Sequence, residues 1–262
     1  MLFPASAMAK DGMRSPGRCT DPIRKDVLLR SASSPCFLSS KASPLVSSAM
    51  KIVGILGSPS VSSRSGTRLN HAQAALQDVA TRLRTITVRE LPAEALLHAQ
   101  FDHPLIRQAL HQVHEAQVVL VSTPIYKAAY SGLLEAFLDL LPQEGLREKT
   151  VIPLAAGGSI AHLLALDYAL KPVLSALGAR DILDPVFATD LQIPKHDTEG
   201  YRPLPEVEER LARTLQTVIA RNDEFLRQED AARERAALLS RLQAPAPGDS
   251  LRWASGDVRW SN

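Results

Sequence analysis

Cysteine is nearly absent from this chain of 262 residues: it has two, Cys19 and Cys36, and both lie within the first 49 residues. From Met50 onward there is none, which excludes a disulfide framework, a thiolate zinc site and a cysteine nucleophile from that part of the chain. No apolar run is long enough for a membrane span or for the core of a signal peptide. We therefore expect a protein of the reducing cytoplasm, with neither a membrane nor a nucleic acid as partner.

Two common nucleotide-binding motifs are also missing. The first apolar run ends in Gly57-Ser58-Pro59-Ser60-Val61-Ser62-Ser63-Arg64-Ser65-Gly66-Thr67. This stretch contains no G-x-G-x-x-G, the pattern that lets a backbone approach a pyrophosphate, and it has Ser62 and Ser63 where a Walker loop has glycine and lysine. Dinucleotide binding of that kind and P-loop nucleotide hydrolysis are therefore not indicated.

What the chain does have is a strand, a hydroxyl-rich loop and a helix in sequence. Lys51 to Leu56 is apolar and rich in β-branched residues, and Leu69, Ala72 and Leu76 recur at helical spacing after the loop. Serine hydroxyls and backbone N–H groups at a helix start suit a phosphate monoester such as that of FMN. The alternative is an ordinary strand-to-helix turn with serine caps.

The composition predicts one domain between two extensions. Residues 1–49 hold seven basic and three acidic residues without apolar periodicity, so we predict a disordered leader, with Met50 standing where a natural start would lie. Residues 50–228 form the predicted domain. Residues 229–262 are charged and alanine-rich and contain Trp253 and Trp260; we predict a disordered tail.

Strands alternate with helical stretches along the domain, which predicts an α/β fold. The five expected strands are 51–56, 84–88, 118–121, 150–154 and 181–188. Right-handed crossovers then give a flavodoxin-like, doubly wound parallel sheet of order 2-1-3-4-5 with helices on both faces. Ligands bind such sheets beyond the carboxyl ends of the strands, where the loops 57–67, 123–130 and 156–159 would meet.

Longer motifs resemble one enzyme family. Gly57-Ser58-Pro59, Arg64-Ser65, the run from Thr123 to Gly132 (TPIYKAAYSG) and Gly157-Gly158 are similar to the flavodoxin-like NAD(P)H-dependent FMN reductases. The run from His162 to Leu174 (HLLALDYALKPVL) resembles one branch, the reductases of two-component alkanesulfonate monooxygenase systems. The similarity covers about residues 50–226.

This resemblance implies hydride transfer from NADPH to FMN and release of the reduced flavin to a partner monooxygenase that desulfonates organosulfonates. It also implies a homodimer or homotetramer. The branch has a tyrosine in the helix after the third strand, and Tyr130 matches it, which implies a π-bulge at a subunit interface. Ser60 departs from the family pattern, which commonly has arginine there, so Arg64 is the only cation of the first loop. The implied FMN ligands are Ser58, Ser63, Arg64, Ser65 and Thr67 for the phosphate, Pro124, Ile125, Tyr126 and Lys127 for the ring, and Gly157 and Gly158 for its edge.

We expect no catalytic acid or base, because the flavin itself accepts the hydride. His162 is then a helix residue near the site, and no metal site is predicted around the three histidines between 103 and 114. Two other functions compete with this interpretation. A flavin-retaining quinone or azo reductase is separable by whether flavin survives purification. A flavodoxin-type electron carrier is disfavoured, because residues 50–230 contain no tryptophan and only a small acidic excess.

Overall fold

The computed structural model describes residues 50–198 and 200–243. The predictions for the leader, residues 1–49, and for Trp253 and Trp260 lie outside the described residues.

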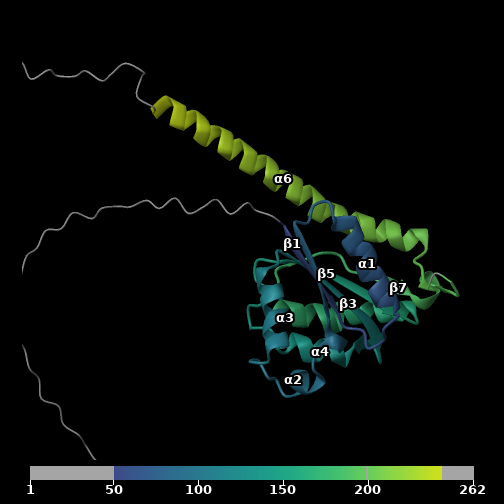
Figure 1. Ribbon diagram of the computed structural model, residues 1–262. Helices are drawn as coiled ribbons and strands as arrows, with labels where there is room; N and C mark the ends of the chain where they lie inside the picture. Colours follow the sequence, from purple (N-terminus) through teal and green to yellow (C-terminus); the bar gives the residue numbers. More distant parts are fainter. Residues whose placement is uncertain (1–49, 199, 244–262) are drawn as a thin grey trace, which may run out of the picture. The chain divides into compact units, whose positions relative to one another are not determined.

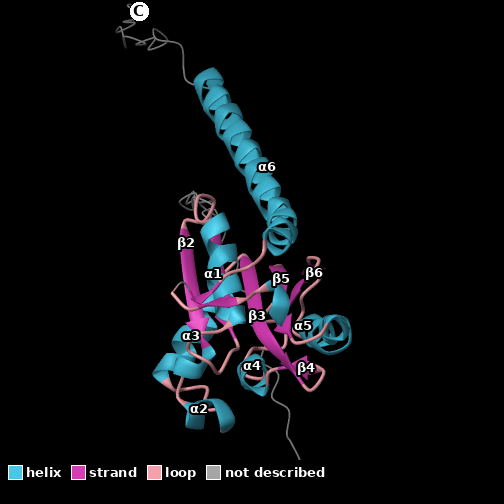
Figure 2. Cartoon of the chain, turned by 90° about the vertical axis from the view of Figure 1, so that its right-hand side faces the viewer, coloured by secondary structure: helices cyan, strands magenta, loops and turns pink. Residues whose placement is uncertain are grey.

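A central parallel sheet organises the fold, as predicted. Its strands are β1 (Lys51–Leu56), β2 (Arg82–Thr87), β3 (Val118–Tyr126), β5 (Thr150–Gly157) and two short segments, β6 (Asp181–Ile182) and β7 (Val186–Thr189). The order is β2-β1-β3-β5-β6, with β7 also paired to β5, and all these pairs are parallel. Figure 2 shows β2, β3, β5 and β6 following one another across the sheet. The order 2-1-3-4-5 is therefore confirmed, with the fifth strand divided around residues 183–185.

Helices cover both faces of the sheet. On one face, α1 (Arg64–Leu76) and the first part of α6 (Pro205–Gln243) bury Leu69, Leu211 and Leu215 against β1 and β5. The other face carries α3 (Pro104–Glu115), α4 (Gly132–Leu138) and α5 (Lys171–Ala176), with the short α2 (Ala93–Leu97) beside them. Figure 1 shows α1 and α6 together above the sheet and α3 and α4 below it. Both faces of β1 and β3 are buried, which explains the absence of polar side chains from residues 52–56 and 118–121.

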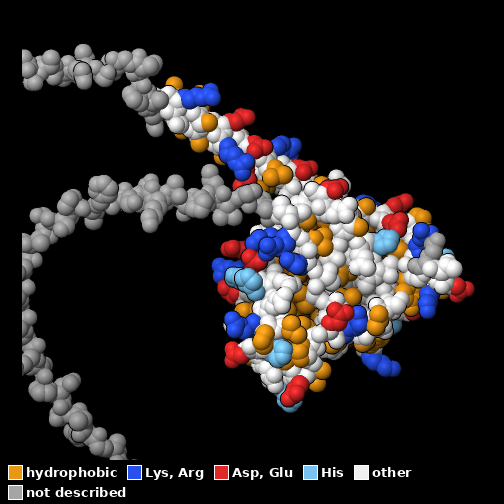
Figure 3. All heavy atoms as spheres, viewed as in Figure 1, with side chains coloured by type: hydrophobic (Ala, Val, Ile, Leu, Met, Phe, Trp, Pro, Cys, Tyr) orange, Lys and Arg blue, Asp and Glu red, His pale blue; other side chains and the backbone are white. Residues whose placement is uncertain are grey.

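The prediction of a disordered tail over residues 229–262 is wrong for residues 229–243, because α6 continues to Gln243. Residues 244–262 lie outside the described residues. No glycine or proline interrupts residues 206–243, and ion pairs such as Arg227–Glu224 (2.8 Å) and Arg233–Glu229 (3.5 Å) support the exposed turns. The second half of the helix projects from the sheet (Figure 1), and charged side chains of both signs alternate along it (Figure 3). Alanine-rich, charged sequence therefore forms helix here rather than a disordered tail.

Tyr130 does not lie in a helix, so the predicted π-bulge at this residue is wrong. It belongs to β4 (Ala129–Tyr130), which pairs antiparallel with the end of β3, Ile125 with Tyr130 and Tyr126 with Ala129. The following helix, α4, begins only at Gly132, capped by Ser131. The Tyr130 ring is buried in its own chain's core, and burial, then the carboxylates of Glu135 and Asp139, raises the pKa of its hydroxyl. Its place at a subunit interface stays a prediction.

A π-helical turn does occur, but one helix later, at η3 (Leu166–Leu170) between the 3-10 turn η2 (Ile160–Leu163) and α5. The N–H of Lys171 donates to the carbonyl of Leu166, five residues back. Pro172 follows directly, and proline has no N–H and clashes with the carbonyl four residues before it. We attribute the wide turn to this proline.

The β3–β4 hairpin turns through Lys127 and Ala128, both with positive φ (48° and 62°). A left-handed backbone disfavours residues with a Cβ atom, so Ala128→Gly should raise the free energy of unfolding by about 1 kcal/mol. Denaturant unfolding of the flavin-free protein measures this. Ala129→Gly, in the strand beside it, is the control and should lower stability by about 0.5–1 kcal/mol; equal effects of the two changes would contradict strain in the turn.

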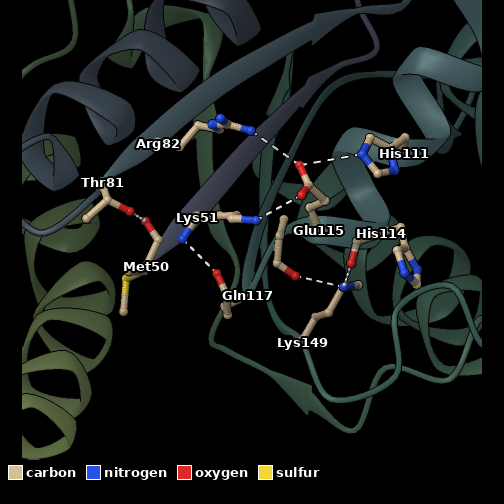
Figure 4. Close-up of polar contacts among 10 residues, drawn as sticks. Met50, Lys51, Thr81, Arg82, His111, His114, Glu115, Gln117 and Lys149 are labelled. Atoms are coloured by element: carbon tan, nitrogen blue, oxygen red, sulfur yellow. Dashed lines mark hydrogen bonds and ion pairs between the residues drawn. The ribbon is translucent and has the colours of Figure 1, made fainter. Parts of the chain in front are cut away.

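Polar contacts gather at the amino ends of the strands (Figure 4). Glu115 of α3 forms ion pairs with Lys51 (2.9 Å) and Arg82 (3.4 Å), and its carboxylate lies 3.7 Å from Nε2 of His111. The hydrogen bond from Lys51, followed by the nearby positive charges, lowers the pKa of the Glu115 carboxyl. Lys149 donates to the carbonyls of His114 (2.8 Å) and Ala116 (2.7 Å). These contacts fasten α3 to the sheet at the edge opposite the candidate site.

Candidate functional site

The carboxyl ends of the strands enclose a cavity of about 300 Å³. The three predicted loops meet there, and a fourth segment joins them from η4 (Asp190–Gln192) and β9 (Gly200–Tyr201), which pairs with β8 (Lys195–His196). The lining residues are Ser58, Ser60, Ser62, Ser63, Arg64, Ser65, Pro124, Ile125, Tyr126, Ala156, Gly157, Gly158, Asp190 and Tyr201.

The amino end of α1 forms one wall of this cavity. The Ser63 side chain caps the helix by accepting from the N–H of Gly66 (3.0 Å), and the Ser63 carbonyl accepts from the N–H of Thr67 (3.0 Å). The N–H groups of Arg64 and Ser65 have no partner in the described part of the chain. Free N–H groups at the positive end of a helix dipole favour an anion.

Ser65 supplies a second indication of a ligand. Its side chain is buried and lines the cavity, yet its hydroxyl has no hydrogen-bond partner among the described residues. Buried polar groups are normally satisfied, and an orphan marks a place where a missing partner belongs. The buried Ser58 hydroxyl accepts from the N–H of Ser60 (3.3 Å) and so holds the loop in its turn.

Arg64 is already engaged by the protein. Its Nε donates to the carbonyl of Ile193 (2.9 Å), and its Nη1 lies 3.4 Å from a carboxylate oxygen of Asp190. Its guanidinium also lies 4.8 Å from the centre of the Tyr201 ring, within the range of a cation–π contact. An anion that entered the cavity would therefore compete with Asp190 for this side chain.

The opposite wall carries fewer polar side chains. Pro124, Ile125 and the half-exposed Tyr126 end strand β3, while Gly157 ends strand β5 and Gly158 follows it. A Cβ atom at Gly157 would lie 2.9 Å from Nδ1 of His162, so only glycine fits between that ring and the strand. This wall offers backbone and an aromatic ring for a planar group.

Hydrogen bonds hold the first and second loops together. The Ser131 hydroxyl donates to the carbonyl of Gly57 and accepts from the N–H of Leu134 (3.2 Å). The Ser131 N–H donates to Oγ1 of Thr123 (3.1 Å), and the Gly57 N–H to the carbonyl of Ser122 (2.8 Å). The cap of α4 thus also fixes the start of the hydroxyl-rich loop, residues 57–67.

Of the eleven residues implied by the resemblance, nine line the cavity and two do not. Thr67 is half-buried on α1 outside the lining, and Lys127 is exposed at the hairpin turn. Sequence reasoning missed Asp190 and Tyr201, because nothing local marks the segment after the last strand as part of the site. It also left Ser60 and Ser62 unassigned, although both belong to the hydroxyl-rich loop and both line the cavity.

His162 lies beside the site rather than in its lining. It sits in η2, and its buried Nδ1 has no partner among the described residues. In the part of the chain that the structure describes, no group of histidine, cysteine and carboxylate side chains has the arrangement of a metal site. No helix among those same residues is long and apolar enough to cross a membrane.

The cavity fits FMN. Free N–H groups, the orphaned Ser65 hydroxyl and Arg64 gather at one wall and supply the donors that a phosphate needs. The other wall is made of strand ends with Pro124, Tyr126 and two glycines, which leave room for a ring system.

Comparison with known proteins also indicates a protein that uses FMN. Residues 50–193 match the family model described as NADPH-dependent FMN reductase. An FMN reductase (NADPH) of Pseudomonas putida is 49% identical over 171 residues, 64% of this chain and 86% of the relative, and that of Escherichia coli is 44% identical over 170 residues, 64% and 87%. The apo crystal structure of an NADH:FMN oxidoreductase, EMOB, superposes with a TM-score of 0.59 at 36% identity, over 64% of this chain and 88% of that one. The chain therefore belongs to the family of NADPH-dependent FMN reductases, flavodoxin-like oxidoreductases that use FMN and NADPH.

Proposed function

We propose that this enzyme reduces FMN as an exchangeable substrate and delivers the reduced flavin to a partner monooxygenase that desulfonates organosulfonates. The observation that carries the proposal is that the one cation in the described lining of the cavity is already paired with a carboxylate. This cation is Arg64, and Asp190 pairs with it at 3.4 Å. A phosphate dianion that must displace a carboxylate is bound less tightly and leaves more readily.

Residues at different positions in the cavity bind different parts of FMN. Ser58, Ser63 and Ser65, together with the first N–H groups of α1, hold the phosphate. Pro124, Ile125 and Tyr126 support the ring, and Gly157 and Gly158 let the β5 backbone approach its edge. FMN, when bound, supplies the hydride acceptor, so the protein's task is to orient the ring and the nicotinamide and to exclude water.

The test is whether flavin is a substrate or a resident group. We expect the purified protein to be colourless and to oxidise NADPH only when free FMN is added, with many FMN molecules reduced per enzyme. A yellow protein that reduces a quinone or azo dye without added FMN would show a flavin-retaining reductase instead.

The partner is tested separately. The enzyme with NADPH, FMN and a flavin-dependent alkanesulfonate monooxygenase should release sulfite from an alkanesulfonate in proportion to the reductase added. Rapid NADPH oxidation without sulfite release, although chemically reduced FMN supports the monooxygenase, would leave the reductase activity intact and overturn the assignment of the partner.

A further inference from the structure

Arg68 is an arginine completely inside the protein. It lies on α1, one helical turn after Arg64, and is 0% exposed, between the sheet and α6. Its Nη1 donates to the carbonyl of Val186 (2.7 Å) and its Nη2 to the carbonyl of Ala155. Nε has no partner among the described residues.

Among the described residues, no carboxylate compensates this charge. None of the ion pairs in this part of the chain includes Arg68, and the charged residue that acts on its pKa is another cation, Arg210. Burial, and then Arg210, lowers the pKa of the guanidinium to about 9. A buried charge without a counter-ion is costly, and proteins keep one where something offsets that cost.

The position of Arg68 relates it to the cavity. Arg64 and Arg68 are four residues apart and so lie on one face of α1, with Arg64 at the cavity. Ala155, which Arg68 contacts, directly precedes Ala156 and Gly157 of the opposite wall, and Val186 begins β7, which leads to Asp190. Arg64 and Asp190 form an ion pair, so their charges in the lining of the cavity cancel. Arg68 lies behind them, and its charge is not compensated.

We propose that Arg68 is the buried counter-charge of the FMN phosphate, a positioning residue that does not touch the ligand. Its field adds to that of the α1 dipole and attracts the phosphate to the end of the cavity where Ser63 and Ser65 lie. Its two bonds to carbonyl groups hold β5 and β7 against α1, so the charge stays fixed where the phosphate arrives. The inference rests on the proposed function, since it requires FMN in this cavity.

The experiment compares FMN with riboflavin, which has the ring but no phosphate. Arg68→Met replaces the charged side chain by an apolar one. Arg68→Lys keeps the positive charge but lacks the planar guanidinium that donates to both carbonyls. We expect Arg68→Met to raise the FMN dissociation constant about tenfold, and that of riboflavin at most about twofold, in flavin-fluorescence titrations. Arg68→Lys should keep the ratio of the two constants within about threefold of wild type, and kcat at saturating FMN should change little in both variants.

The control is Arg213→Met, which removes the same charge from an exposed position on α6 outside the cavity lining and should change neither constant. Equal weakening of FMN and riboflavin in Arg68→Met would reduce Arg68 to a packing role and overturn the proposal.

Arg68→Gln is the second neutral variant in case Arg68→Met does not fold. If neither neutral variant folds while Arg68→Lys does, the fold itself needs the charge and the proposal is likewise overturned. Failure of the wild type to bind FMN would instead overturn the proposed function.

Discussion

Arg64→Ala should weaken FMN binding by about 1.5–3 kcal/mol, the range for a hydrogen bond to a charged group. Among the described residues, Arg64 is the one cation in the cavity lining, and its guanidinium is the strongest donor available to a phosphate. Equilibrium titration of flavin fluorescence measures the change. Riboflavin should bind nearly as before, because the lost contact is to the phosphate; if both ligands weaken equally, Arg64 is a structural residue that ties α1 to Ile193.

Asp190→Asn is the matched change on the other side of this ion pair. Removal of the carboxylate frees Arg64 for the phosphate, so FMN should bind more tightly and leave more slowly. We expect the variant to retain some flavin through purification and to show a lower KM for FMN. Weaker binding of FMN in this variant would mean that Asp190 serves to hold Arg64 in place rather than to compete with the ligand.

Gly57→Ala should be among the most damaging single substitutions near the site. A Cβ atom at Gly57 would lie 2.5 Å from Cβ of Leu134, which is fully buried on α4. The strand end or the helix must then shift, and overpacking of this kind costs about 1–3 kcal/mol of folding free energy. The shift also separates the Gly57 carbonyl from the Ser131 hydroxyl, so FMN affinity should fall together with stability.

Gly132→Ala is the control for this prediction. A Cβ atom at Gly132 meets no heavy atom within 4 Å, and the residue is the first of α4. This variant should be neutral or more stable by up to about 1 kcal/mol, because alanine favours a helix over glycine. Thermal unfolding of both variants measures the difference in their stability. Equal stabilities would mean that the end of β1 shifts without loss of folding free energy.

The elements of this protein could be predicted from the sequence where local pattern and burial agree. Residues 52–56 and 118–121 carry no polar side chain, because both faces of the sheet are covered. Ser122 follows the second run directly, and Ser58 follows the first after Gly57. Alternation of strand and helix then limits the sheet to few topologies. The three loops that meet at the carboxyl edge follow from that topology alone.

Tertiary structure decided what depends on contacts between distant residues. Asp190 and Tyr201 reach the cavity because β7 places the segment that follows it beside α1. No sequence pattern near these two residues predicts that position. The hairpin at Lys127 and Ala128 adopts a backbone that neither residue prefers, so pairing of β4 with β3 overrides local preference there. Arg68 illustrates the same limit. From the sequence, a charged side chain on a helix is expected to be exposed to solvent, and only the hydrogen bonds to carbonyl groups of β5 and β7 make the burial of Arg68 possible. Short-range energies select strands and helices, whereas the position of a side chain in the site depends on packing across the whole sheet, which the local sequence does not encode.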